Sequence, residues 1–289
     1  MLPQLIVSGL AQGVLYALVA LSMTMVYRAT TVVNFGHGDL VMGGAFAVYI
    51  FVVYRGLPYV WGGLLALVTL FALGVLIYRG LVRRAMTGPH LAVAMMALAI
   101  GYALRGVARV FWGREVLPFP RIFPDRAWLI GNVVITGDNL VISGTVLGLM
   151  AVLFALFHLT RTGKLIQAVF QSQRGAALVG LNVGAFHAVM WGAGAALGAL
   201  GGVLLAPITH LYPDMGVWVL LRGFAAMTLG GFGSFHGAVL GGLILGVMEL
   251  VLGAYVSTAF IDISAYLVVL VVLLCRPDGL FGRQAVVRV

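Results

Sequence analysis

Three polar side chains, Asn34, His37 and Asp39, lie close together in the stretch VVNFGHGDLVMGGA, residues 32–45, and four glycines interrupt the same stretch. Interrupted backbone is tolerated in a bilayer only where it is buried in protein or lines a water-filled cavity. Exposed N–H groups at the start of a half-helix would suit an anionic group. We therefore expect this segment to border an aqueous path, with these candidate residues: Asn34, Phe35, His37, Gly38 and Asp39.

A second glycine-rich stretch, LGGFGSFHGAVLGG at residues 229–242, repeats a rough pattern of His-Gly followed by Gly-Gly. Each stretch lies near the start of one half of the chain. Paired interrupted segments in the two halves of a membrane protein are a sequence indicator of a transport site. The additional candidates for the path are Gly230, Gly231, Gly233 and Ser234. Close packing between helices is the alternative explanation for both stretches.

The elements that must position these residues are membrane-spanning helices. Of the 289 residues, 62% are hydrophobic and 9% are charged, whereas soluble domains carry roughly 25% charged residues. Most charge-free runs reach the roughly 17–25 residues that a helix needs to cross a bilayer. We expect an all-α polytopic protein with about eight crossings, folded as a single transmembrane domain over residues 1–289. The net charge of +9 lies in short loops, which fits the positive-inside rule and not nucleic-acid binding.

Loop charges suggest a topology. Arg79, Arg83 and Arg84 mark one cytoplasmic loop, and residues 160–183 form a second, so the loop at residues 112–138 is expected outside and irregular because it holds three prolines. The tail, with Arg276, Arg283 and Arg288, is expected inside. Spans near 184–206, 236–256 and 258–275 supply three crossings. The segments 32–54 and 217–234 are either re-entrant or broken full spans, and we favour an N-terminus inside.

Glu249 lies near the middle of an expected span at residues 236–256. An ionised side chain there is costly unless it is paired. Arg222 is the favoured partner in a structural ion pair, and Arg105 or Arg109 are the alternatives.

Residues 164–181 of the second cytoplasmic loop alternate apolar and polar residues at near-helical spacing, and the apolar positions are Leu165, Ala168, Val169, Ala176, Val179 and Gly180. This pattern predicts one short amphipathic helix. An apolar face on an aqueous loop requires a partner. The helix either lies on the membrane surface or docks to a cytosolic subunit.

Four separated motifs, in order from Leu10 to Gly282, resemble one family. VVNFGHGDLVMGGAF, GKLIQAVFQSQRGAALVGLNV, LGGFGSFHGAVLGGLILGVMEL and RPDGLFG are similar to segments of branched-chain amino acid ABC importer permeases of the LivH type. The resemblance implies a multi-pass permease of the bacterial inner membrane. Its implied partners are a homologous LivM-type permease, two cytosolic ATP-binding subunits of the LivG and LivF type, and a periplasmic substrate-binding protein.

The resemblance also implies that the second cytoplasmic loop is the coupling loop, which seats on an ATPase. The implied coupling residues are Gly163, Lys164, Gln167, Ala168, Gln171, Arg174, Ala177 and Gly180. The loop departs from the family pattern, because Gln167 stands where Arg is usual and Gln171, Ser172 and Gln173 stand where acidic residues are frequent.

The expected function is therefore uptake of branched-chain amino acids or a related small polar solute, such as another amino acid, an amide, urea or an organic acid. The sequence contains no G-x-x-x-x-G-K-[ST] motif, so ATP hydrolysis is expected from partner chains, and this chain is expected to be neither an enzyme nor a binder of a cofactor or metal. An ion-coupled secondary transporter is the alternative, because it would share the broken helices.

Overall fold

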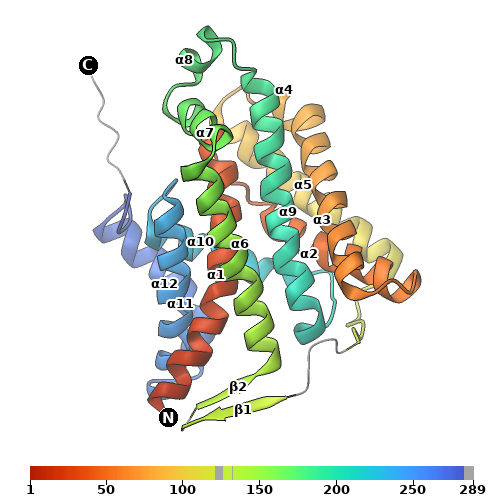
Figure 1. Ribbon diagram of the computed structural model, residues 1–289, viewed down its shortest axis with the longest axis vertical. Coiled ribbons are helices and arrows are strands. Elements are labelled where there is room, and N and C mark those ends of the chain that lie inside the picture. The colour runs from red at the N-terminus through yellow and green to blue at the C-terminus, as the bar shows by residue number, and fades with distance from the viewer. Residues whose placement is uncertain (121–125, 132, 283–289) are drawn as a thin grey trace. The chain divides into compact units, whose positions relative to one another are not determined.

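The computed structural model describes residues 1–120, 126–131 and 133–282, which leaves Arg121, Asp125, Arg283 and Arg288 of the charged loop and tail outside the described residues. Among these residues, every regular element is a helix apart from one two-stranded hairpin (Figure 1). The first half comprises α1 (Leu2–Thr30), α2 (His37–Tyr49) with a π-helical extension (Ile50–Tyr54), α3 (Tyr59–Ile77) with a π-helical extension (Tyr78–Val82), α4 (Arg83–Ala85), α5 (His90–Trp112), β1 (Ala127–Ile130) and β2 (Val133–Thr136). The second half comprises α6 (Gly137–Leu159), α7 (Arg161–Gln171), α8 (Gln173–Leu178), α9 (Val183–Thr209), α10 (Met215–Gly230), α11 (Phe235–Tyr255) and α12 (Ala259–Cys275).

Within the described residues, seven helices are long and apolar enough to cross a membrane, and α10 and α12 are shorter apolar helices. The expected all-α polytopic fold is confirmed. The three crossings expected between residues 184 and 275 do not agree with the expected sides, because a segment whose two ends both lie inside must cross an even number of times. Four apolar helices, α9 to α12, occupy this part of the described residues, and α9 and α11 are the two that are long enough to span a membrane.

The N-terminus lies beside the β-hairpin (Figure 1). The amide of Gln4 donates to the carbonyl oxygen of Val134 at 3.0 Å, and the backbone N–H of Val134 donates to Gln4 at 2.7 Å. The hairpin belongs to the loop at residues 112–138 that is expected outside, so these contacts favour an N-terminus on that same side, in contrast to the N-terminus inside that the sequence favoured. The hairpin itself was not expected. Its second strand is rich in β-branched residues, and Gly131 supplies the positive φ of +62° that a tight turn requires.

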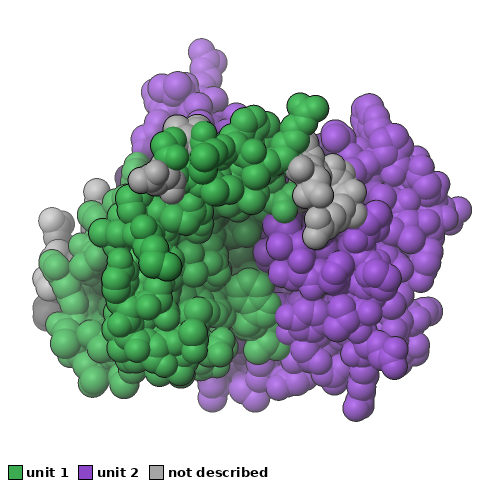
Figure 2. All heavy atoms as spheres, turned by 90° about the horizontal axis from the view of Figure 1, so that it is seen from below, with its two compact units in different colours: residues 1–24, 122–144, 217–289 green, residues 25–121, 145–216 purple. Residues whose placement is uncertain are grey.

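The described residues form two compact units, each discontinuous in sequence (Figure 2). Unit 1 comprises residues 1–24, 122–144 and 217–289, and unit 2 comprises residues 25–121 and 145–216. In unit 2 the most extensive packing joins α9 to α3 and to α2. Gly44 of α2 lies so close to Ala199 of α9 that an added Cβ would collide with the Ala199 backbone.

Unit 1 is also packed through close contacts at helical glycines. The first part of α1 approaches α11 through Gly13, where a Cβ would lie 2.8 Å from the carbonyl oxygen of Gly242. Gly241 of α11 lies even closer to α10, because its Cβ would collide with the carbonyl oxygen of Ala226. The glycine pairs 43–44 and 241–242 were expected to interrupt helices, yet all four are helical. Small side chains let neighbouring helix backbones touch, so close packing explains Gly44, Gly241 and Gly242.

Candidate functional site

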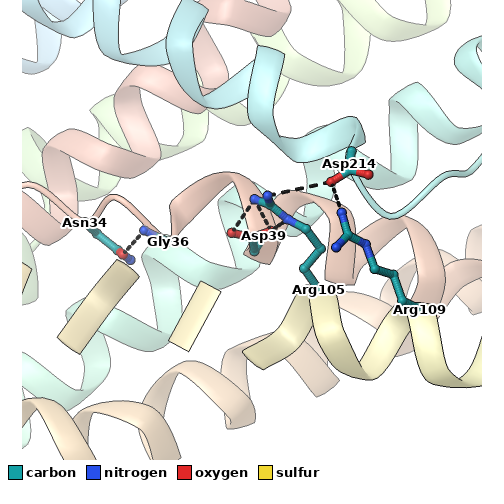
Figure 3. Close-up of polar contacts among 6 residues, drawn as sticks. All are labelled: Asn34, Gly36, Asp39, Arg105, Arg109 and Asp214. Carbon is teal, nitrogen blue, oxygen red and sulfur yellow. Dashed lines mark hydrogen bonds and ion pairs between the residues drawn. The ribbon is translucent and has the colours of Figure 1, made fainter. Parts of the chain in front are cut away.

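The first break occupies residues 31–36, between α1 and α2 (Figure 3). The Asn34 side chain is 4% exposed, and its Oδ1 accepts a hydrogen bond from the backbone N–H of Gly36 at 3.0 Å. The N–H of His37 donates to the carbonyl oxygen of Asn34 at 3.1 Å, which starts α2. Asn34 therefore shapes the turn that ends the break, because an Asn side chain readily bonds its own backbone two residues on.

Phe35 and His37 face different surroundings. Phe35 is 41% exposed, whereas His37 is fully buried and its ring lies against Gly198 of α9. A Cβ added at Gly198 would lie 2.9 Å from Nε2 of His37. Among residues 31–36, Thr31 and Phe35 are the exposed ones and Asn34 is buried, as are His37 and Asp39 at the start of α2.

Helix α5 lies directly against the break. A Cβ on Gly36 would collide with the carbonyl oxygen of Ala97, and a Cβ on Gly101 would lie 2.9 Å from the Cα of Gly36. Both glycines are needed at this close approach because any side chain would push α5 away. One turn further along α5, Arg105 follows Gly101 and reaches the break.

Asp39, in the first turn of α2, pairs with Arg105 in a two-pronged geometry (Figure 3). Nε of Arg105 donates to Oδ1 at 2.9 Å and Nη2 donates to Oδ2 at 3.1 Å. The Asp39 side chain is 4% exposed and that of Arg105 is 15% exposed. Planar, two-pronged pairs of this kind are strong and fix orientation. Arg105, considered above as a partner of Glu249, therefore holds Asp39 instead.

The same cluster contains Arg109, considered above as a partner of Glu249, and Asp214, which the sequence did not single out. Asp214 lies 2.6 Å from Nη2 of Arg109 and 3.7 Å from Nη1 of Arg105. Asp214 immediately precedes α10. One signal was present in the sequence, since Arg105 and Arg109 are four residues apart on a helix and must share a face that requires acidic partners.

The second break, residues 231–234 of unit 1, turns through Gly231 and Gly233, which have φ of +102° and +77°. The hydroxyl of Ser234 accepts from the N–H of Gly237 at 3.1 Å and so caps α11. The two breaks belong to different units.

Residues 278–282 form a short segment, the strap, that lies against the second break. The N–H of Leu280 donates to the carbonyl oxygen of Leu229 at 2.9 Å, and that of Phe281 donates to Gly230 at 3.1 Å. A helix leaves its last four carbonyls without partners of its own, so the strap satisfies two of those of α10. The role of the RPDGLFG motif in closing α10 was not predicted.

Arg222 and Glu249 form a buried pair in unit 1. Nη2 of Arg222 lies 2.6 Å from Oε1 of Glu249, and Nε lies 3.0 Å from the same oxygen. Glu249 is fully buried, and the Arg222 side chain is 10% exposed. Arg222 also donates to the carbonyl oxygen of Ile261 at 2.9 Å and stacks over Trp218 at 4.9 Å.

The segment expected as one amphipathic helix is two helices, α7 and α8, separated by Ser172. Ser172 is extended, and its hydroxyl caps α8 by accepting from the N–H of Gly175 at 3.0 Å. Because the chain is not helical at Ser172, the positions that face the same side in α7 do not continue into α8. The single apolar face that was expected across both helices was therefore wrong: Val169 and Ala176 are buried, whereas Leu165, Ala168 and Val179 are exposed.

The eight residues that were expected to couple to an ATPase divide by exposure. Gly163 is buried where α7 meets α6, and Gln167 is half-buried and donates to the carbonyl oxygen of Phe157 at 2.6 Å. The exposed ones are Lys164, Ala168, Gln171, Arg174, Ala177 and Gly180. Together with Leu165, Leu178 and Val179, which are 49%, 89% and 78% exposed, they leave a mixed apolar and basic surface on α7 and α8.

The sequence is similar to known permeases over nearly its whole length. Residues 5–275 match the family model described as "Branched-chain amino acid transport system / permease component". The high-affinity branched-chain amino acid permease LivH of Salmonella typhimurium is 30% identical over 98% of this chain and 96% of its own length. The corresponding BraD of Pseudomonas aeruginosa is 30% identical over 99% of this chain and 97% of its own.

Two further similarities are more distant. The fructose import permease FruG of Bifidobacterium longum is 30% identical over 53% of this chain and 48% of its own length. A solved structure, PsaBC from Streptococcus pneumoniae in complex with Fab, shares the fold with a TM-score of 0.50 and 15% identity, over 96% of this chain and 92% of that one.

Proposed function

Because the chain belongs to the family of branched-chain amino acid transport permeases, as a LivH-type member in the inner membrane, we propose that it is one half of the translocation path of a binding-protein-dependent ABC importer. A homologous LivM-type permease forms the other half. Two cytosolic ATPases of the LivG and LivF type drive it, and a periplasmic binding protein delivers the solute. The proposed cargo is a branched-chain amino acid or a related small polar solute. The similarity to a fructose permease keeps that class broad.

The exposed surface of α7 and α8 carries this proposal. Leu178 and Val179 are 89% and 78% exposed on a segment beyond the end of α6, and Lys164 and Arg174 flank them. Apolar side chains in such a position call for a protein partner. Docking of an ATPase fits this surface better than a bilayer does, because Gln171 and Arg174 stand among the apolar side chains.

The same segment is attached to the first break. Gln173 donates to the carbonyl oxygen of Ala29 at 3.3 Å, and the guanidinium of Arg28 lies 5.1 Å from the ring centre of Phe170. Both contacts are made with the last turn of α1, and the first break, residues 31–36, follows directly in the chain. If the ATPases move α7 and α8, the end of α1 would therefore move with them and would displace the break directly, with no other helix in between.

At the break, backbone and Phe35 are proposed to border the path. Asn34 and Asp39 are already engaged by Gly36 and Arg105, so they hold the wall in shape. At the second break, Gly230, Gly231, Gly233 and Ser234 are proposed to play the equivalent part, with Ser234 acting through its cap on α11.

The test uses the full complex in proteoliposomes, with binding protein and labelled solute. Arg174→Glu reverses an exposed charge of the docking surface, and Gly180→Val strains a residue with φ of +86°. Both are expected to lower ATP-driven uptake at least tenfold while the affinity of the binding protein for the complex is unchanged. Arg126→Glu, an exposed arginine of the outer loop, is the matched control. Unchanged uptake in both variants, or uptake that persists without ATP and stops with a protonophore, would contradict the proposal.

A further inference from the structure

The start of α2 and the start of α10 touch through glycine. A Cβ added at Gly216 would collide with the carbonyl carbon and oxygen of Gly38. Each helix also begins with an acid, Asp39 in the first turn of α2 and Asp214 immediately before α10. Two helix N-termini, each carrying partial positive charge, are thus brought together with one carboxylate apiece to offset it.

Arg105 is shared between these two acids (Figure 3). Its Nε and Nη2 hold Asp39, and its Nη1 faces Asp214 at 3.7 Å. Arg109 supplies the shorter contact with Asp214, 2.6 Å. The two arginines and two aspartates balance in charge, and they tie α2, α5 and the connection before α10 together.

The two ends of this cluster differ in exposure. The Asp39–Arg105 end is 4% and 15% exposed and satisfied at both prongs, whereas the Asp214–Arg109 end is 53% and 37% exposed. The Nε of Arg109 is buried and, among the described residues, has no hydrogen-bond acceptor. The outer pair thus uses only part of the arginine's donors, and solvent and salt can compete for it.

We propose that Asp214 and Arg109 are positioning residues of transport that form an outer latch. The latch holds the first turns of α2 and α10 together, and it must release before they can separate and open the first break. Its place follows from the chain: α9 leaves the cytoplasmic loop at residue 183 and ends at Thr209, so Asp214 lies on the outer side. The Asp39–Arg105 pair stays closed throughout. This inference rests on the proposed function.

The variant that tests the latch is Asp214→Asn, because Asn is as good a helix-capping residue as Asp and the change removes charge alone. In the full complex without binding protein, it is expected to raise ATPase activity roughly two- to fivefold, the range that a partly exposed ion pair allows. Asp214→Glu keeps the charge and should return the rate to that of the unaltered complex. Asp138→Asn, another aspartate in the first turn of a helix, is the control and should leave the rate unchanged.

Salt separates a latch from a purely structural role. Raising NaCl from about 50 to 500 mM shortens the screening length to a few ångströms, so it should raise the rate of the unaltered complex toward that of Asp214→Asn and leave Asp214→Asn flat. If Asp214→Asn does not assemble, Arg109→Gln removes the other partner and must give the same pattern. Equal rates in Asp214→Asn and Asp138→Asn, or an equal salt response in the unaltered complex and Asp214→Asn, overturn the latch. A complex that imports solute normally yet gives those results leaves the proposed function standing, whereas absence of ATP-driven uptake by the unaltered complex refutes the proposed function itself.

Discussion

Replacing Arg222 with methionine is expected to destabilise the protein far more than the same change at Arg109. Methionine keeps much of the apolar stem of arginine and removes the charge. At position 222 it leaves the carboxylate of Glu249, which is fully buried, without its cation. At position 109 it leaves Asp214, whose side chain is 53% exposed and which water can solvate.

The magnitudes follow from burial. Removing one partner of a buried pair costs about 3–5 kcal/mol because an uncompensated charge remains, whereas a partly exposed pair contributes about 0.2–1 kcal/mol. At about 1.4 kcal/mol per tenfold change, Arg222→Met should lower the ratio of folded to unfolded protein by roughly two to four orders of magnitude. Arg109→Met should change it by about fivefold at most.

The double variant Arg222→Met, Glu249→Leu identifies the cause. Without either charge, the remaining cost is the lost donor to the carbonyl oxygen of Ile261, which the Arg222 side chain supplies at 2.9 Å, or about 1 kcal/mol. Unfolding by sodium dodecyl sulfate in mixed micelles, followed by tryptophan fluorescence, gives the free energies. A double variant as unstable as Arg222→Met alone would refute the reasoning, as would Arg222→Met within 1 kcal/mol of Arg109→Met.

Three further changes test the packing and the caps. Gly44→Val should lower the free energy of unfolding by about 1–3 kcal/mol, because the added side chain pushes α2 away from α9. Gly80→Val, at a helical glycine with no neighbour within reach of a Cβ, should lower it by less than about 1 kcal/mol in the same unfolding assay. Gly279→Ala places a side chain at φ of +76° against Gly231, so hydrogen exchange of the Leu280 and Phe281 amides should accelerate at least tenfold, and unchanged exchange would argue against the strap. Ser234→Ala removes the cap of α11 and should cost about 0.5–2 kcal/mol, with Ser234→Asn restoring stability; a change in the solute concentration for half-maximal uptake, with stability unchanged, would instead mark the hydroxyl as a solute contact.

The sequence was sufficient to predict which segments break and which charges need partners. Glycine clusters beside polar residues indicated breaks within residues 34–44 and 229–242, since lipid penalises unpaired backbone, and the structure has shorter breaks that overlap them at residues 31–36 and 231–234. It could not predict which helices are neighbours. Arg105 was equally compatible with Glu249 or Asp39, because spacing along a chain does not say which helix faces which. Asp214 went unnoticed since it lies in a connection, where an acid usually faces water.

The segment 164–181 shows how a local rule was missed. The apolar period favoured one helix, yet Ser172 precedes Gly175 by three residues, which is the spacing of a hydroxyl cap on a helix N-terminus. The cap stops α7 and starts α8, and it turns Val179 outward. When the spacing of apolar residues is judged over both helices together, such a break is hidden. Each helix alone is too short for its own spacing to contradict the prediction of one continuous helix.

Backbone strain indicates where the first break can move. Among the described residues, Thr31 and His210 are the two non-glycine residues with positive φ, +57° and +58°. Each costs about 1–2 kcal/mol to hold in that conformation. Thr31 joins α1 to the break, and His210 begins the connection that carries Asp214. Between these two residues, α2 contacts the backbone of α9 at Gly44. This close packing resists gradual deformation, because packed helices have few alternative arrangements. We expect opening of the first break to concentrate at these two strained joints, because the packed helices between them resist gradual deformation.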